Sequence, residues 1–418
     1  MTRTVGNKDN RGIGVAFDIG TTTVVGSSVD FSTGKVLSTL SAANPQVVRG
    51  RDVIARINAI VQSPALLDEM RAAVIGACNG IMKGLTLPGP VTEITAAGNP
   101  VMESILLGIS PEPLSRVPYK PAFTGAQRVA AAMLGFEVPS GVTLYAFPLI
   151  GGFVGGDAVA VALSLGIGKA SSPTLAIDIG TNSEILLAAR GNIYAASAAA
   201  GPAFEGGELK YGMTAQSGAI QGVKIEGDSL ALDVIGAVAP RGICGSGLIE
   251  AASALIKAAV IDRSGRIKGR DEVPNNLSAR IREEAGGNSF ILYRGAGGEV
   301  LLDQSDIRAL QTAKSATRAG ILMLLKKGST TAADVGKVYI AGAFGSRLEK
   351  EGLKTIGLLD EGWLDGVSSV GDAALTGAVE ALRDEKKLEA EELAGRIRYV
   401  SLSGSSHFEK EFIKNMNF

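Results

Sequence analysis

The sequence predicts an α/β protein built from two related lobes. The chain has 418 residues, more than a single hydrophobic core usually accommodates, so two or three lobes are expected. Apolar residues make up 46% of the chain and charged residues 20%, a composition typical of globular proteins. The phrase Asp-Ile-Gly-Thr ends an apolar run at Asp18 and again at Asp178. Such a repeat indicates two half-molecules with a common plan.

Each copy of the phrase has the composition of a phosphate-binding turn between two strands of a hairpin. The carboxylate stands where the first strand ends, and the glycine allows the backbone to approach an anion closely. The hydroxyl groups and turn N–H groups that follow are donors for phosphate oxygens. Two such turns are expected to hold a polyphosphate from both sides. Their residues are Asp18, Gly20, Thr21 and Thr22 in the first copy, and Asp178, Gly180, Thr181 and Asn182 in the second.

A cation is expected beside these turns, because neither phrase contains Lys or Arg. Asp18 and Asp178 are the natural holders of Mg²⁺, through water, because this ion retains its waters readily. The P-loop string Gly-x4-Gly-Lys-Ser/Thr is absent from the chain.

The first half alternates strands and helices after a polar N-terminal tail, residues 1–12. Three strands are predicted across residues 13–41, with a hairpin connection at Asp30 to Lys35. Residues 50–87 have a helical pattern interrupted near Ser63-Pro64, and a strand at 91–98 leads to a helix capped by Asn99. The remaining predictions are a loop-rich stretch at 108–141 with one short helix at 124–134, a strand at 144–150, and a helix at 154–166.

The second half repeats this plan. Strands at 175–179, 184–189 and 193–198 surround the second turn, and a Gly-rich loop occupies 200–218. Further elements are strands near 220–226 and 230–235, a helix from 245 to about 259, a polar insertion near 260–300, a helix at 305–327, a strand from 337, and a helix after 371. The lobes are therefore predicted at 13–168 and 169–418, the second including the insertion and the C-terminal helices.

A nucleotide also requires a surface for its base and ribose. Glycine turns that follow strands in the second half allow close backbone approach, although each alone is more often a plain turn. The predicted binding residues here are Gly201, Gly245, Ser246, Gly342, Phe344 and Gly345.

Asp157 is the one charged residue in the apolar stretch 142–168. Two interpretations remain open at equal weight. It is either an N-cap of the helix that begins there, or a catalytic base beside the γ-phosphate. Glu205 is a second, weaker candidate for the catalytic role.

Composition excludes several classes of function. The net charge is −1, from 41 basic and 42 acidic residues, so no basic field is available for nucleic acid. Two cysteines and one histidine are too few for a self-contained iron–sulfur or zinc site, which usually needs about four ligands. The polar N-terminus is unlike a signal peptide, and Asp157 and Pro148 interrupt the most apolar stretch. A cytoplasmic protein that does not span a membrane is expected, with both thiols buried.

Together the phrases resemble the nucleotide site of the actin, heat-shock chaperone and sugar-kinase superfamily. The Asp18 and Asp178 turns are similar to its two phosphate motifs, and Ile340 to Gly345 is similar to its adenosine motif. The segments beginning at Gly155 and Gly371 are similar to its two connecting motifs. The resemblance implies two actin-like (ribonuclease H-like) lobes with a nucleotide cleft between them, and ATP and Mg²⁺ as cofactors.

The chain is also similar, over nearly its whole length, to the reductive activators of corrinoid enzymes. The motifs that carry this resemblance are Asn44-Pro-Gln, Asp52 to Ile57, Ala97 to Met102, Leu106 to Gly108, Ala199 to Gly206, Gly245 to Leu248, Asp306 to Arg308 and Ala313-Lys314. The resemblance implies an ATPase that drives electron transfer to an inactive cob(II)alamin protein and restores cob(I)alamin. It further implies a homodimer and a corrinoid or other redox protein as partner.

Three features depart from that family. The chain begins almost directly at the first phosphate strand and lacks the cysteines of an iron–sulfur domain, so a separate ferredoxin-like electron donor is expected. Glu103 stands where the family commonly has His, and Asp372 where Asn is common. Two alternative functions remain, a small-molecule kinase with Asp157 as base, and a nucleotide-switched scaffold without turnover.

Overall fold

The computed structural model describes residues 12–295, 298–342 and 349–418. The chain divides into two compact units, each formed from two segments. Unit 1 consists of Met1–Lys169 and Ala373–Tyr399, and unit 2 of Ala170–Asp372 and Val400–Phe418. The sequence predicts that residues 373–399 belong to the second lobe; this is wrong, because in the structure they pack on the first. No helix among the described residues is long and apolar enough to cross a membrane.

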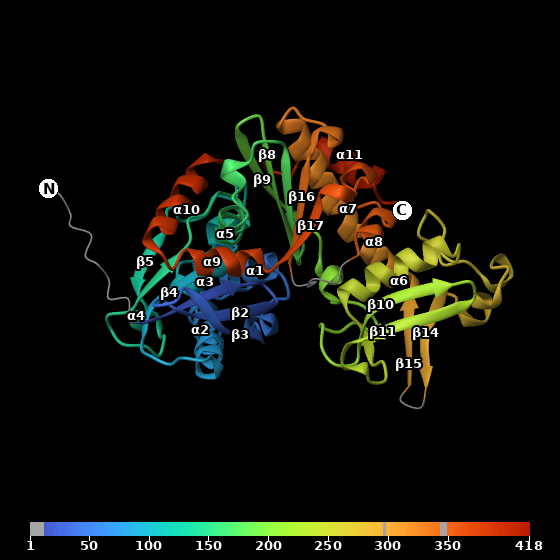
Figure 1. The fold of residues 1–418 in the computed structure, drawn as a ribbon, viewed down its shortest axis with the longest axis horizontal. Helices are drawn as coiled ribbons and strands as arrows, with labels where there is room; N and C mark the ends of the chain where they lie inside the picture. Colours follow the sequence, from blue (N-terminus) through green and yellow to red (C-terminus); the bar gives the residue numbers. More distant parts are fainter. Residues whose placement is uncertain (1–11, 296–297, 343–348) are drawn as a thin grey trace. The chain divides into compact units, whose positions relative to one another are not determined.

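A six-stranded sheet forms the centre of unit 1 (Figure 1), in the order β3-β2-β1-β4-β6-β5. Strand β1 pairs antiparallel with β2 and parallel with β4, so its carboxyl end lies beside the end of β4. Apolar side chains of β1 are buried on both faces, as expected for a central strand. The strands are β1 (Ile13–Ile19), β2 (Thr23–Asp30), β3 (Lys35–Ala43), β4 (Val91–Gly98), β5 (Gln127–Ala130) and β6 (Thr143–Ala146).

Helices from both segments of the chain complete unit 1. The predicted break near Ser63-Pro64 separates α1 from α2, and Asn99 caps α3 as expected. After unit 2 the chain returns, and α9 packs against β1, β4 and α5. The helices are α1 (Val53–Gln62), α2 (Leu66–Gly84), α3 (Pro100–Leu107), α4 (Ala131–Leu134), α5 (Gly156–Ser164), α9 (Ala373–Glu380) and α10 (Asp384–Arg396), and β18 (Ile397–Tyr399) ends the unit.

Unit 2 repeats the core of this sheet, in the order β17-β16-β7-β8-β9. Strand β7 corresponds to β1: it pairs antiparallel with β8 and parallel with β16. In both units the Asp of the repeated phrase belongs to this central strand. The strands are β7 (Thr174–Asp178), β8 (Asn182–Ala189), β9 (Asn192–Ala199), β16 (Lys337–Ala341) and β17 (Val367–Gly371).

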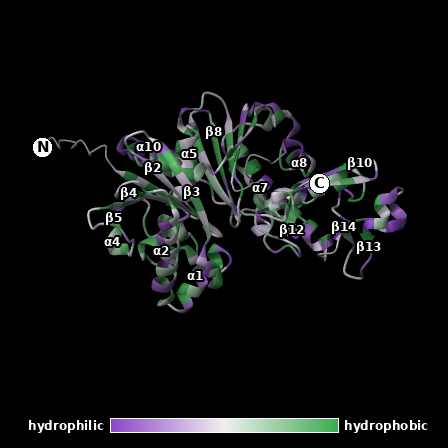
Figure 2. Ribbon diagram, turned by 60° about the horizontal axis from the view of Figure 1, so that its bottom comes forward, coloured by the Kyte–Doolittle hydropathy of each residue, from purple (hydrophilic) through white to green (hydrophobic). Residues whose placement is uncertain are grey.

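A second layer of unit 2 lies between β9 and β16 in the sequence. Helix α6 runs along the β10–β11 hairpin, and α7 packs against β8 and β9 (Figure 1). Figure 2 shows mainly hydrophobic residues on labelled strands such as β8, and hydrophilic turns on α10. The elements are β10 (Ala219–Glu226), β11 (Ser229–Val234), β12 (Gly242–Ile243), α6 (Gly245–Lys257), β13 (Ile281–Arg282), β14 (Ser289–Gly295), β15 (Gly298–Asp303) and α7 (Gln304–Lys327). Two further helices of unit 2 follow β16 in the sequence, α8 (Lys350–Thr355) and α11 (Ser406–Lys414).

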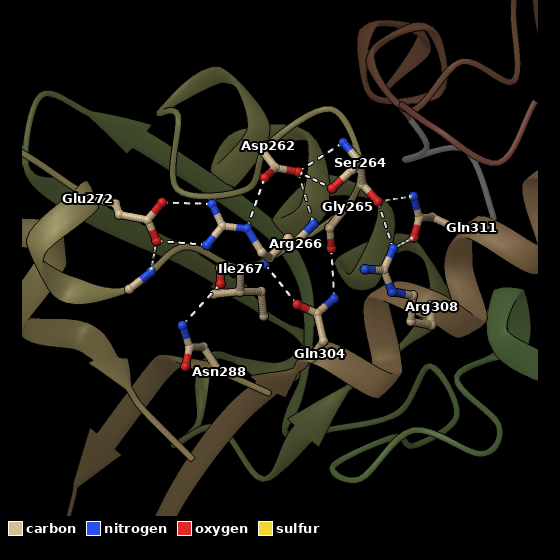
Figure 3. A network of polar contacts seen from close by, with 11 residues as sticks. Asp262, Ser264, Gly265, Arg266, Ile267, Glu272, Asn288, Gln304, Arg308 and Gln311 are labelled. Carbon is tan, nitrogen blue, oxygen red and sulfur yellow. Dashed lines mark hydrogen bonds and ion pairs between the residues drawn. The ribbon is translucent and has the colours of Figure 1, made fainter. Parts of the chain in front are cut away.

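The segment predicted as a polar insertion, 260–300, is held to α7 by a polar network (Figure 3). Gln304 accepts from the Ile267 N–H at 2.9 Å and donates to the Gly265 carbonyl at 2.7 Å. Within the segment, Arg266 makes a two-pronged contact with Glu272, both N–O distances being 2.7 Å. The network gives this loop-rich part of unit 2 a defined position on α7.

One predicted element of unit 1 is wrong. The sequence analysis places a helix at 124–134, but β5 occupies Gln127–Ala130 and only Ala131–Leu134 is helical. The cause is non-local, because β5 pairs antiparallel with β6, whose residues lie more than ten positions later.

Candidate nucleotide-binding site

The first phosphate turn, loop 1 (Gly20 to Thr22), is fixed by side chains from distant segments. Asn44 Nδ2 donates to the Gly20 carbonyl and the Asn44 N–H to the Thr22 carbonyl, each at 2.8 Å. At Gly20 an added Cβ would lie 2.6 Å from the Thr23 carbonyl oxygen. The turn therefore requires glycine at this position, and its backbone is held in place by contacts within unit 1.

Arg56 is the most unusual support of loop 1. It is fully buried, and Nη2 donates to the Thr21 carbonyl at 2.5 Å. Nε donates to the Gly50 carbonyl and Nη1 to Gln46 Oε1, both at 2.9 Å. Burial lowers the pKa of Arg56 to about 10, so the guanidinium remains charged at neutral pH. Loop 1 contains no Lys or Arg, but the charged Arg56 contacts its backbone. The sequence alone did not predict this contact.

Asn99 joins loop 1 to the end of β4. Its Oδ1 accepts from the N–H groups of Val101 and Met102, at 3.1 and 3.0 Å, which caps α3. Its Nδ2 donates to the Thr21 hydroxyl oxygen at 3.1 Å. Asn44, Arg56 and Asn99 come from three of the motifs that carry the resemblance to corrinoid activators, and all three converge on one turn.

Two carboxyl groups lie close to one another at the start of α5. The N-cap of this helix is Gly155, so the interpretation of Asp157 as N-cap is wrong; its Oδ1 accepts instead from the Ala158 N–H at 2.7 Å. Burial raises the pKa of Asp157 to about 6. This carboxylate is therefore largely ionised at neutral pH and has the basicity that a proton acceptor needs.

Glu103 of α3 is the second carboxyl group and is completely buried. Its Oε1 accepts from the Gly98 N–H at 3.1 Å, and its Oε2 has no hydrogen-bond partner among the residues that the structure describes. Burial, with a smaller contribution from the charge of Asp157, raises its pKa well above the ordinary value. An added Cβ at Gly156 would lie 2.0 Å from Oε1, so this carboxyl group also requires the glycine.

The second phosphate turn, loop 2 (Gly180 to Asn182), lies at the end of β7. The Gly201 N–H donates to the Thr181 carbonyl at 2.9 Å, which brings a predicted nucleoside residue onto the turn. Thr181 itself is buried, and its N–H and hydroxyl donate to Glu205 Oε1 at 2.5 and 2.9 Å. The donors predicted for phosphate therefore converge on one anionic oxygen.

Gly342 lies directly beside Asp178. Ala341 at the end of β16 is the register partner of Asp178, and the Ile179 N–H donates to the Ala341 carbonyl at 3.0 Å. Gly342 has a φ of +115°, and an added Cβ would lie 2.4 Å from the Ile179 carbonyl oxygen and 3.2 Å from Asp178 Oδ1. Glycine is therefore required for this close packing of β16 against the end of β7. Phe344 and Gly345 lie outside the described residues.

Gly245 and Ser246 form the first turn of α6, directly after its N-cap, Cys244. Gly206 packs against the Cys244 backbone, because an added Cβ there would lie 3.4 Å from Cys244 Cα. The short turn that carries Glu205 therefore connects loop 2 to the start of α6. These contacts bring together the predicted site residues of unit 2, which are Asp178, Gly180, Thr181, Asn182, Gly201, Gly245, Ser246 and Gly342. The predicted site residues of unit 1 are Asp18, Gly20, Thr21, Thr22 and Asp157.

The described part of the chain contains no group of three or more His, Cys, Asp or Glu side chains placed to hold a metal ion directly. Binding of Mg²⁺ through water by Asp18 and Asp178 does not need such a group and stays a prediction.

Comparisons with known proteins extend over nearly the whole chain. A family model described as the RACo middle region matches residues 13–170, and one described as the C-terminal domain of RACo, the ASKHA domain, matches residues 172–418. The corrinoid activation enzyme RamQ of Eubacterium limosum is 31% identical over 423 residues, which cover 97% of this chain and 70% of RamQ. The [Co(II) methylated amine-specific corrinoid protein] reductase of Methanosarcina barkeri is 25% identical over 362 residues, covering 78% and 63%.

A solved structure, of the reductive activator for corrinoid, iron-sulfur protein, has the same fold. It matches with a TM-score of 0.90 and 34% identity, over 99% of this chain and 67% of its own. The chain thus spans about two thirds of the length of these relatives. The match to an ASKHA domain confirms the actin-like fold that the sequence predicts.

Proposed function

The chain belongs to the RACo family of corrinoid activators, and from this we propose that it is an ATPase that reductively activates a corrinoid protein. ATP binding and hydrolysis would be coupled to transfer of one electron that reduces cob(II)alamin to cob(I)alamin. The proposal of nucleotide binding is supported mainly by the duplicated turn. In each unit the central strand leads into the same Asp-Ile-Gly-Thr phrase, and the neighbouring strands have the same order.

The residues fit a nucleoside triphosphate in chemical terms. Thr181 offers an N–H and a hydroxyl to one anionic oxygen, and Gly20, Gly180 and Gly342 allow tight backbone packing at the two turns. We assign Asp18 and Asp178 to Mg²⁺, which would offset the phosphate charge. Asp157, with a pKa near 6, is the proposed acceptor of a proton from the attacking water.

The electron is proposed to come from a separate iron–sulfur protein. The 418 residues contain two cysteines, Cys78 and Cys244, which are both buried and belong to different units. Burial raises the pKa of the Cys78 thiol, which keeps it protonated and a poor metal ligand. A homodimer, also expected from the family, would be tested by the mass of the purified protein in solution.

The test is Mg-ATP turnover with and without a cob(II)alamin protein. Asp18→Asn and Asp178→Asn are expected to lower turnover by about 10–100-fold, the usual effect of losing a group that orients a metal's ligands. Asp157→Asn should lower turnover while nucleotide binding persists. Asp365→Asn, at an exposed position of unit 2, is the matched control and should have no effect.

Two results would contradict the proposal. One is turnover that neither Asp18→Asn nor Asp178→Asn diminishes. The other is a phosphorylated metabolite formed without any need for a corrinoid protein, which would identify a small-molecule kinase instead.

A further inference from the structure

Glu205 occupies the position where loop 2 would bind an anion. One carboxylate oxygen, Oε1, accepts both from the Thr181 N–H at 2.5 Å and from the Thr181 hydroxyl at 2.9 Å. The same oxygen faces Gly180, where an added Cβ would lie 3.2 Å away. A negatively charged oxygen bound by a turn N–H and a hydroxyl beside glycine is the arrangement expected for a bound phosphate oxygen.

One pair of donors cannot serve two anionic oxygens at full strength. A phosphate oxygen that enters this position meets a carboxylate already bound there, and like charges at such a distance repel. We propose that Glu205 is a built-in competitor for the nucleotide: its carboxylate substitutes for a phosphate oxygen at loop 2 and must leave when the nucleotide binds. This inference rests on the proposed nucleotide-binding function and adds a residue that sets nucleotide affinity.

The backbone around Glu205 is fixed, so the exchange requires only movement of its side chain. Phe204 is buried in the core of unit 2, and the Gly207 N–H donates to the Pro202 carbonyl at 2.9 Å. Gly206 has a φ of +77°, and an added Cβ there would lie 2.6 Å from the Met213 carbonyl oxygen. The Glu205 side chain is only half-buried, which leaves it a path toward solvent.

The contact also pairs two buried donors of loop 2. Thr181 is 6% exposed, and a buried N–H without an acceptor is destabilising. Glu205 provides that acceptor. The side chain that stabilises the turn is therefore the one that opposes its proposed ligand. Its removal should affect stability and affinity in opposite directions, which a purely structural role would not do.

The experiment compares wild type, Glu205→Ala, Glu205→Gln and Glu208→Gln in the full chain. Calorimetry gives the Kd for MgATP and MgADP, and thermal unfolding gives the Tm of the nucleotide-free protein. Glu208 is exposed, three residues from Glu205, so Glu208→Gln removes the same charge without touching loop 2 and is the matched control.

Glu205→Ala is expected to bind MgATP about tenfold more tightly than wild type, equivalent to ~1.4 kcal/mol. Glu205→Gln should lie between the two, because a neutral amide oxygen competes less well. Both should lower the Tm of the nucleotide-free protein, and Glu208→Gln should change neither quantity. If wild type binds nucleotide and Glu205→Ala binds it equally or less tightly, the competitor role of Glu205 is refuted while the proposed nucleotide binding stands. If no variant binds nucleotide, the proposed function is refuted as well.

Discussion

At the scale of single residues, Glu103 is a carboxyl group whose charged form is strongly destabilised by burial. The folded protein keeps this carboxyl group completely buried, with one oxygen unpaired among the described residues and the charge of Asp157 nearby. The pKa of Glu103 in the folded state is therefore well above the ordinary value of 4.5. In the unfolded chain the same group is expected to titrate near its ordinary value.

The linkage between this pKa and stability gives a prediction. Below about pH 4.5 both states hold the proton and Glu103 has no pH-dependent effect. Above it the unfolded chain releases the proton while the folded protein retains it, so stability decreases as pH rises toward the folded pKa. Glu103→Gln removes this loss. The free energy of unfolding of Glu103→Gln minus that of wild type should be larger at pH 8 than at pH 5. This difference should grow by at most ~1.4 kcal/mol per pH unit.

Urea denaturation at the two pH values measures the difference. Glu385→Gln, at an exposed position on α10 of the same unit, is the control and should show no such pH dependence. An equal effect of Glu103→Gln at both pH values would mean that the buried carboxyl group titrates normally.

At the scale of elements, loop 1 depends on a charge that its own sequence lacks. Arg56 of α1 reaches the Thr21 carbonyl, and the planar guanidinium donates to three oxygen acceptors at once. Lysine keeps the charge but not this fork of donors. Arg56→Lys should therefore lower the free energy of unfolding by about 2–5 kcal/mol, because buried acceptors lose their partners. It should also weaken MgATP binding.

Arg51→Lys is the matched control, since Arg51 is exposed and lies five residues before Arg56. Urea denaturation and calorimetry of both variants provide the comparison. A change of less than about 0.5 kcal/mol for Arg56→Lys, the usual range for surface substitutions, would show that the guanidinium does not hold loop 1.

Local elements could be predicted from the sequence because their causes are local. The Asp18 and Asp178 hairpins have a turn phrase between two apolar runs, and Asn99-Pro100 contains both the cap and the first turn of α3. The long helix α7 follows its apolar periodicity. It begins one residue before the predicted start and ends at the predicted residue.

The supports of the two loops could not be predicted, because they depend on contacts between distant residues. Arg56 meets Thr21 across 35 positions, and Glu205 meets Thr181 across 24. The strand at Gln127–Ala130 likewise forms only because β6 is available to pair with it. A pattern within one segment contains no information about which distant backbone group it will contact.

At the scale of the whole molecule, unit 1 is completed by residues that follow unit 2 in the chain. The Thr95 hydroxyl of β4 donates to the Ala378 carbonyl of α9 at 2.7 Å. Lys387 of α10 forms a buried ion pair with Glu93 of β4. The central sheet of unit 1 thus depends on contacts with residues that lie about 280 positions later, after the whole of the first segment of unit 2.

The returning helix α9 packs very closely against α5. Gly377 of α9 lies against α5, and an added Cβ would be 2.0 Å from the Ala160 carbonyl oxygen and 2.5 Å from its carbon. Because both are backbone atoms, the helices must separate to admit even a methyl group. Gly377→Ala should therefore destabilise unit 1 by about 1–3 kcal/mol or more, with faster amide hydrogen exchange in β1 and β4.

Gly395→Ala is the control in the same unit, because Gly395 lies in α10 with no atom within 4 Å of an added Cβ. It should be neutral or stabilise by up to ~1 kcal/mol, the usual gain from alanine over glycine in a helix. Similar stability for both variants would mean that α9 does not close the core of unit 1. A loss confined to Gly377→Ala, with exchange in β7 and β8 unchanged, would show that the returning helix stabilises the first unit without affecting the second.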